Sequence, residues 1–300
     1  MDMTISSALR SDRLCLGLTG LRVQEFHALV PVFSSTLNQV MRERHGEGQR
    51  GFGGGRKSGL SRPDEKLFFV LMYLKIYPTF DAISFLVGLD RSNCCRQEHF
   101  LMKVLGQTLG RKLVLPERRI RSVEEFFEKF PEAKDIFIDG TERRVQKPKN
   151  QKKRKKLYSG KKKATTRKTI VVNDEKKRVL ILTPTRSGRR HDKRLFEKDI
   201  GGRTIPSDIA VWVDTGFQGI QHNHPNTQIP KKNTKKHPLT QSDRDDNRLI
   251  SSIRIVAEHT IAGIKRYKAA SDIYRNKLIN LDDTFMFLSA GLWNYHLSCS

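Results

Sequence analysis

The chain has 300 residues, enough to bury a core in one large domain or two modest ones. Its 57 Lys and Arg residues against 32 Asp and Glu residues give a formal net charge of +25, which indicates a polyanionic partner. No long apolar run or basic amphipathic helix accompanies this charge, so nucleic acid is expected and a membrane is not. The four cysteines are too few and too irregularly spaced for a disulfide framework or a zinc site, and they indicate a reduced, cytosolic protein.

Residues 1–45 are predicted to form an N-terminal helical segment. Apolar residues recur at helical spacing from Leu18 to Arg44, which predicts either one long helix or two helices broken at Pro31. Thr19 is placed to cap the first turn. Residues 46–59 hold seven glycines among Arg and Lys without any periodicity, and they are predicted to be a flexible basic linker.

Residues 60–116 are predicted to form a helix-turn-helix DNA-binding domain. Helical patterns cover 63–75, 79–88 and 92–105, and Gly88 permits the turn before the third helix. The predicted core of this domain consists of Leu67, Phe68, Leu71, Ile83 and Leu86. An ordinary helical bundle is the alternative. Four polar residues near the start of the third helix are expected to contact phosphates or base edges: Ser92, Asn93, Arg96 and Gln97.

Residues 117–300 are predicted to form an α/β domain. Residues 117–134 indicate a helical connector with Phe126, Phe127 and Phe130 on its buried face. The period then changes, and the pattern predicts strands at 135–139, 169–172 and 178–184, a helix at 191–198, a strand at 209–214 and a helix at 243–267. This is the order of a ribonuclease H-like α/β fold with a mixed sheet, although other α/β folds share it.

A run of basic residues lies between the first two predicted strands. Fourteen of the twenty-six residues from Arg143 to Lys168 are Lys or Arg. Such a run is often only a solvated, disordered surface. Its place beside Asp139 favours an arm that follows DNA phosphates, because each neutralised phosphate releases a counterion.

Two acids, Asp139 and Asp214, are each predicted to close an apolar strand, and small turn-forming residues follow both. Strand ends at one edge of a sheet would place the two carboxylates side by side, which is costly unless a cation lies between them. Mg²⁺ suits such a pair, with positions left for water and phosphate oxygens. Asp is also common in turns after strands, so either acid alone would indicate no metal.

A third acid, Glu258, lies in the last predicted helix. Arg254, Glu258 and Lys265 follow at intervals of four and seven residues and therefore share a helix face. Glu258 could complete a metal site while Arg254 and Lys265 face a DNA backbone. An exposed helix with salt bridges explains the same spacing without any function.

Several motifs in order resemble the DDE transposases of bacterial insertion sequences, specifically the insertion-sequence-five-like group. They are Ile138 to Glu142 (Ile-Asp-Gly-Thr-Glu), Tyr158 to Lys161 (Tyr-Ser-Gly-Lys), Val213 to Gly219 (Val-Asp-Thr-Gly-Phe-Gln-Gly), and Arg254 with Glu258 and Lys265. The run from Ser187 to Asp192 resembles a further motif of such proteins. The resemblance covers about Leu60 to the C-terminus. Ser251 departs from it, because related transposases often have Tyr three residues before the Arg.

The resemblance implies a ribonuclease H-like catalytic core with a metal-binding, catalytic triad of Asp139, Asp214 and Glu258. The cofactors would be two Mg²⁺ (or Mn²⁺) ions, and the reaction would nick the element's ends and join them to target DNA. The partners would be double-stranded DNA and further copies of the chain, in the cytoplasm at the bacterial nucleoid.

Further residues are assigned supporting roles. Arg254, Lys265, Lys161 and Lys162 would bind DNA. His191 and Glu142 are candidates for support of the metal site, although His191 could be only a capping or surface residue and Glu142 only a charge partner. Two rival functions are a domesticated, non-catalytic DNA-binding regulator and a ribonuclease H-like nuclease without strand transfer.

Overall fold

The computed structural model describes residues 5–45, 59–235, 237–278 and 280–299. The chain divides into two compact units: the helical unit, Met1–Leu115 with Arg266–Ala270 and Gly291–Ser300, and the mixed unit, Pro116–Lys265 with Ser271–Ala290. The predicted linker lies almost entirely outside the described residues, since 46–58 are not among them. Two helices, α11 (Lys268–Ser271) and α12 (Leu281–Ser298), contribute residues to both units.

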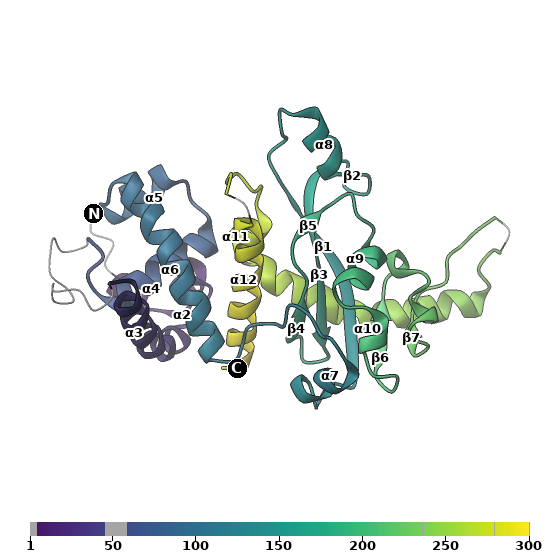
Figure 1. The fold of residues 1–300 in the computed structure, drawn as a ribbon. Coiled ribbons are helices and arrows are strands. Elements are labelled where there is room, and N and C mark those ends of the chain that lie inside the picture. Colours follow the sequence, from purple (N-terminus) through teal and green to yellow (C-terminus); the bar gives the residue numbers. More distant parts are fainter. Residues whose placement is uncertain (1–4, 46–58, 236, 279, 300) are drawn as a thin grey trace. The chain divides into compact units, whose positions relative to one another are not determined.

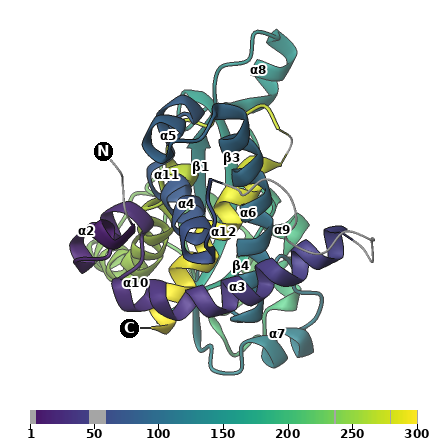
Figure 2. The same cartoon turned by 90° about the vertical axis from the view of Figure 1, so that its left-hand side faces the viewer.

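The helical unit begins with α1 (Ile5–Ala8), α2 (Asp12–Thr19) and α3 (Val23–His45). Helix α3 passes through Pro31 without a break, so the one-helix alternative is confirmed (Figure 2). The predicted cap at Thr19 is wrong, because Thr19 ends α2 and its hydroxyl donates to the Cys15 carbonyl at 2.7 Å. Glu25 caps the start of α3 instead, since its carboxylate accepts a hydrogen bond from the Arg22 amide at 2.8 Å.

The three helices predicted after the linker are present as α4 (Pro63–Ile76), α5 (Phe80–Val87) and α6 (Arg91–Arg111). Gly88 ends α5 with a φ of 67°, in the left-handed region that glycine adopts without steric cost. Asp90 caps α6 by accepting from the Ser92 and Asn93 amides at 2.9 and 3.1 Å. The predicted core is confirmed except at Leu86, which is 37% exposed because the short α5 buries only Ile83.

The mixed unit is built around one mixed sheet. Its strands are β1 (Asp135–Arg144), β2 (Tyr158–Ser159), β3 (Ala164–Asp174), β4 (Val179–Leu182), β5 (Arg186–Ser187), β6 (Ala210–Val213) and β7 (Thr227–Gln228). Its helices are α7 (Val123–Lys129), α8 (Gln151–Leu157), α9 (Asp192–Asp199) and α10 (Gln241–Lys265). The strand order is β2-β3-β1-β6-β7, with β4 and β5 also paired to β3 (Figure 1). Strand β1 runs antiparallel to β3 and parallel to β6, which makes the sheet mixed as predicted.

The core of this unit lies where apolar side chains of the central strands meet α7 and α9. Ile136 and Ile138 of β1 and Val211 and Val213 of β6 are completely buried. Of the three phenylalanines assigned to the buried face of the connector, Phe126 and Phe130 are buried, but Phe127 is 43% exposed.

Strand β1 is longer than its apolar part. It continues through Gly140 to Arg144 because β3 pairs with it as far as Arg144 opposite Thr166. The prediction that Asp139 closes the strand is therefore wrong. The basic run after β1 also contains a helix, α8, that shows no apolar periodicity in the sequence.

Candidate active site

Asp139 and Asp214 are brought together by the register of β1 and β6. The two strands run parallel from Asp135 opposite Ala210 to Ile138 opposite Val213, and Asp139 and Asp214 are the next residue of each. Asp139 thus stands where pairing with β6 stops, although β1 itself continues. The two acids therefore lie side by side as predicted, although Asp139 does not end its strand.

Backbone amides orient both carboxylates. Asp139 Oδ1 accepts from the Gly140 amide at 2.7 Å. Asp214 caps the short 3₁₀ turn Thr215–Phe217, and its Oδ1 accepts from the Gly216 amide at 2.7 Å. Each acid therefore has its Oδ2 outside this amide contact, and Lys161 Nζ lies 3.9 Å from Asp214 Oδ2.

The charge balance at this pair fits a cation. Burial and the neighbouring Asp214 charge raise the pKa of Asp139 from 3.8 to about 6, against the opposing effects of the Gly140 amide, Arg254 and Lys161. A half-buried carboxylate next to a second carboxylate is stabilised by a hard divalent cation, whose oxygen ligands these residues can supply. The two acids therefore suit such an ion.

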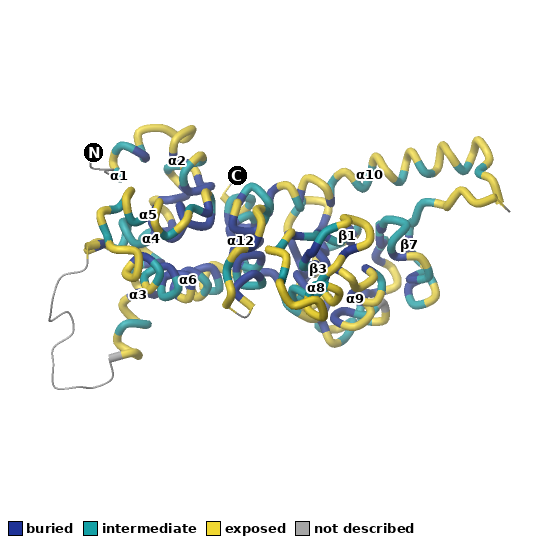
Figure 3. Tube along the Cα trace, turned by 90° about the horizontal axis from the view of Figure 1, so that it is seen from above, coloured by how far each residue is buried: buried dark blue, intermediate teal, exposed yellow. Residues whose placement is uncertain are grey.

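Glu258 is placed differently. It is exposed on α10, and the described part of the chain holds no group of three or more His, Cys, Asp or Glu side chains arranged to hold a metal. The structure thus brings together Asp139 and Asp214 but does not group Glu258 with them, as the predicted triad requires. Much of the N-terminal half of α10 is exposed (Figure 3).

The two basic residues on the same side of α10 do face the acids. Arg254 and Lys265 each interact electrostatically with Asp139, and Glu258 lies between them on the helix face that all three share. Burial and the Lys162 charge lower the pKa of Lys265. Arg254 Nε is buried without a hydrogen-bond partner among the described residues.

A buried ion network lies beside the acids. Lys168 of β3 places its Nζ 2.6 Å from Asp192 Oδ1 and 3.1 Å from Glu142 Oε1, and it donates to the Arg190 carbonyl at 3.0 Å. Thr166 donates its hydroxyl to Glu142 Oε2 at 2.6 Å. Burial opposes the charge on Lys168, but Asp192 and Glu142 outweigh it and raise the pKa of Lys168. Glu142 is thus a charge partner of Lys168.

Asp192, at the start of α9, packs against the backbone that follows both acids. A Cβ at Gly140 would lie 3.0 Å from Asp192 Cγ, and one at Gly216 would lie 3.2 Å from Asp192 Oδ2 and 2.8 Å from Asp214 Oδ1. A larger residue at either position would therefore displace an acidic side chain of the site. The sequence analysis did not include Asp192 in the triad. The glycines that follow the two acids, Gly140 and Gly216, were the sequence signal that another group packs closely there.

His191 precedes α9 as its capping residue, but its side chain makes no capping hydrogen bond. It is exposed and lines a pocket of about 780 Å³ whose other walls come from Lys156, Ser187, Arg189, Arg190 and Arg194. These surroundings suit an anion.

The residues expected to bind DNA fall in both units. Lys161 stands next to Asp214, and Lys162 is close enough to Lys265 to affect its pKa. At the start of α6, Ser92, Asn93 and Arg96 are exposed and Gln97 is half-buried. Arg96 donates to Asn93 Oδ1 at 2.6 Å, so these two side chains present a joined polar surface.

Comparison with known families identifies two matching regions of the chain. Residues 138–294 match the DDE superfamily endonuclease family, and residues 59–111 match the helix-turn-helix of DDE superfamily endonucleases. The chain therefore belongs to the DDE superfamily of endonucleases.

One relative of the chain is named as a transposase. The probable transposase for insertion sequence element IS702 of Microchaete diplosiphon is 29% identical over 280 residues, which cover 93% of this chain and 96% of that protein. No solved structure matches the chain. Within the described residues, no helix has the length and hydropathy needed to cross a bilayer. The predicted resemblance is confirmed, while the insertion-sequence-five-like subgroup stays a prediction.

Proposed function

We propose that this protein is the transposase of an insertion sequence, which binds the element's ends, nicks them and joins them to target DNA. The juxtaposition of Asp139 and Asp214 at the end of the β1–β6 pairing carries this proposal. Family membership and the helix-turn-helix support it. The mixed sheet, with α10 packed on β1, β3 and β6, supports a ribonuclease H-like core.

The metal ligands would be Asp139, Asp214 and Glu258, and the ions two Mg²⁺ or Mn²⁺. Such ions, when bound, lower the pKa of an attacking water or 3′-hydroxyl and stabilise charge on the leaving oxygen. The raised pKa of Asp139 and the position of Glu258 between two basic residues that face Asp139 support this assignment.

Basic side chains around the acids would position the DNA strand. Arg254, Lys265, Lys161 and Lys162 would neutralise phosphates on either side of the cleaved bond, which holds the reacting groups in line. No residue needs to form a covalent intermediate, because the freed 3′-hydroxyl is itself the nucleophile for joining.

DNA recognition would combine the two units. The start of α6 would contact the element's ends, and the basic residues of the arm from Arg143 to Lys168 would follow the backbone. Because two ends must be joined to one target, at least a dimer on DNA is expected. We place this activity in the cytoplasm, at the nucleoid.

The test is cleavage of a plasmid that carries the element's own ends, in Mg²⁺ or in EDTA. Wild type should nick the plasmid only with Mg²⁺. Asp139→Asn should bind the ends with unchanged affinity and not cleave, and the exposed Asp208→Asn should behave like wild type. Binding without any metal-dependent cleavage by wild type would favour the regulator, and cleavage without joining would favour the nuclease.

A further inference from the structure

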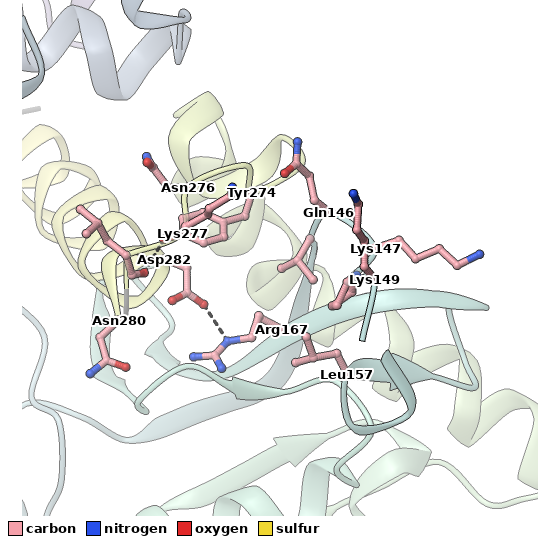
Figure 4. Close-up of a pocket in the computed structure, with 13 residues that line it drawn as sticks. Gln146, Lys147, Lys149, Leu157, Arg167, Tyr274, Asn276, Lys277, Asn280 and Asp282 are labelled. Carbon is pink, nitrogen blue, oxygen red and sulfur yellow. Dashed lines mark hydrogen bonds and ion pairs between the residues drawn. The ribbon is translucent and has the colours of Figure 1, made fainter. Parts of the chain in front are cut away.

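A pocket of about 610 Å³ lies in the mixed unit (Figure 4). It is formed by the chain that follows β1, the end of α8 and the segment before α12. Three lysines line it, Lys147, Lys149 and Lys277. Within the described chain, none of their ammonium groups pairs with an acidic side chain, so their charges are available to an anionic ligand.

The walls of the pocket are fixed by hydrogen bonds. Tyr274 is held to the end of β1, because its amide donates to the Arg144 carbonyl at 2.9 Å and its carbonyl accepts from the Gln146 amide at 3.1 Å. Its hydroxyl donates to the Leu278 carbonyl at 2.9 Å. These contacts join segments far apart in the sequence into one preformed wall.

A second wall of the pocket contains an arginine whose charge is balanced by an aspartate of the same wall. Arg167 Nε donates to Asp282 Oδ2 at 2.7 Å (Figure 4). Arg167 Nη2 donates to the Thr185 carbonyl at 3.0 Å. Since Asp282 balances the guanidinium, the net positive charge of the pocket comes from the three lysines. Leu157 and Leu278 add apolar surface, and Asn276 adds a side-chain amide.

The sheet places this pocket on the same face as Asp139. Arg167 of β3 lies opposite Arg143 of β1 in the antiparallel register of the two strands. Arg143 stacks on Tyr274, with its guanidinium 5.0 Å from the ring centre. Arg143 lies four residues after Asp139 on β1 and therefore points to the same side. At about 3.3 Å per residue, the part of the pocket formed by Arg167 and Val145 lies roughly 13 to 20 Å from Asp139.

The composition of the pocket selects its ligand. The pocket around His191 is lined by charged and polar side chains alone, which suits phosphate. The present pocket adds apolar surface and side-chain amides to its lysines, and its volume is that of a small-ligand site. Apolar surface and amides suit a nucleobase, and lysines suit its phosphate.

We propose that this pocket receives one unstacked nucleotide of the DNA end. The base would lie against Leu157 and Leu278 near Asn276, and its phosphates would contact the lysines. This inference rests on the proposed function. With a rise of about 3.4 Å per nucleotide, the distance from Asp139 corresponds to roughly four to six nucleotides from the cleaved phosphate.

The test uses full-length protein and end fragments that carry 2-aminopurine at single positions from the first to the eighth nucleotide. Because unstacking relieves quenching, binding should raise the emission several-fold at one position, near the fourth to sixth nucleotide. Leu278→Asn and Lys277→Ala should each at least halve that rise. Leu249→Asn, at an exposed leucine of α10, is the matched control and should leave the rise unchanged.

Two results would overturn the proposal. One is a similar, small emission change at every position while wild type binds and cleaves the unlabelled end. The other is a rise at one position that Leu278→Asn and Lys277→Ala both leave intact. Failure of the proposed function is a separate result, since it would appear as no specific binding or cleavage of the unlabelled end.

Discussion

Replacing Lys168 by Met should destabilise the mixed unit strongly. Its side chain is 6% exposed and lies between Glu142 and Asp192, whose side chains are 4% and 10% exposed. Removal of the cation leaves two buried carboxylates without a cationic partner, which costs about 3–5 kcal/mol of unfolding free energy. The matched control is Lys176→Met, because Lys176 pairs with Glu132 at the surface, where the side chains are 68% and 83% exposed. An exposed pair of this kind contributes little to stability, because solvent screens the two charges.

Urea unfolding followed by tryptophan fluorescence measures both variants. The chain has two tryptophans, so a Trp293→Phe background leaves Trp212 of β6 as the reporter of the mixed unit. Equal, small losses of unfolding free energy in Lys168→Met and Lys176→Met would refute the buried network as a major source of stability.

Three further predictions concern the acids and the DNA surface. Since the pKa of Asp139 is raised to about 6, this carboxyl should lower the unfolding free energy of metal-free wild type, relative to Asp139→Asn, by at most about 3 kcal/mol as pH rises from about 4 to 7. Asp139→Asn should lack this loss in urea titrations across the pH range, and an equal loss would contradict the cause given. Gly216→Ala places a Cβ 2.8 Å from Asp214 Oδ1 and should lower the plasmid cleavage rate at least about tenfold. Gly17→Ala, with nothing within 4 Å of the added Cβ, should not change this rate; equal rates for the two variants would argue against a steric effect. Arg96→Ala should weaken DNA binding and reduce the salt slope by about one in a fluorescence anisotropy titration, and an unchanged slope would exclude a phosphate contact.

The elements with strong periodicity could be predicted from the sequence. Helices α4, α5 and α6 and strands β1, β3, β4 and β6 all appear where apolar spacing indicates them. The second half of β1 could not be predicted, because the side chains that it buries, Thr141 and Arg143, are polar and give no apolar alternation in the sequence. Leu86 and Phe127 were assigned to the core by type alone, although packing leaves them exposed.

The candidate site was predictable only in part. Asp139 and Asp214 were found because each follows an apolar strand segment. The network of Lys168, Glu142 and Asp192 was not found, because a buried charge cannot be distinguished from an exposed one in a chain this rich in Lys and Arg. Glu258 was correctly placed on a helix face with Arg254 and Lys265, but helical spacing cannot say how far its carboxylate lies from the other two acids.

Strand transfer by Glu258→Gln tests the central claim most directly. Pre-cleaved ends with free 3′-hydroxyls are incubated with a supercoiled target and Mg²⁺, and end binding is measured in parallel. Glu197→Gln, at a partly exposed glutamate of α9 paired with Lys193, serves as the matched control. We predict joined products with wild type and Glu197→Gln and none with Glu258→Gln, at equal affinities for the ends. Joining by Glu258→Gln at the wild-type rate would contradict the assignment of Glu258 as the third metal ligand.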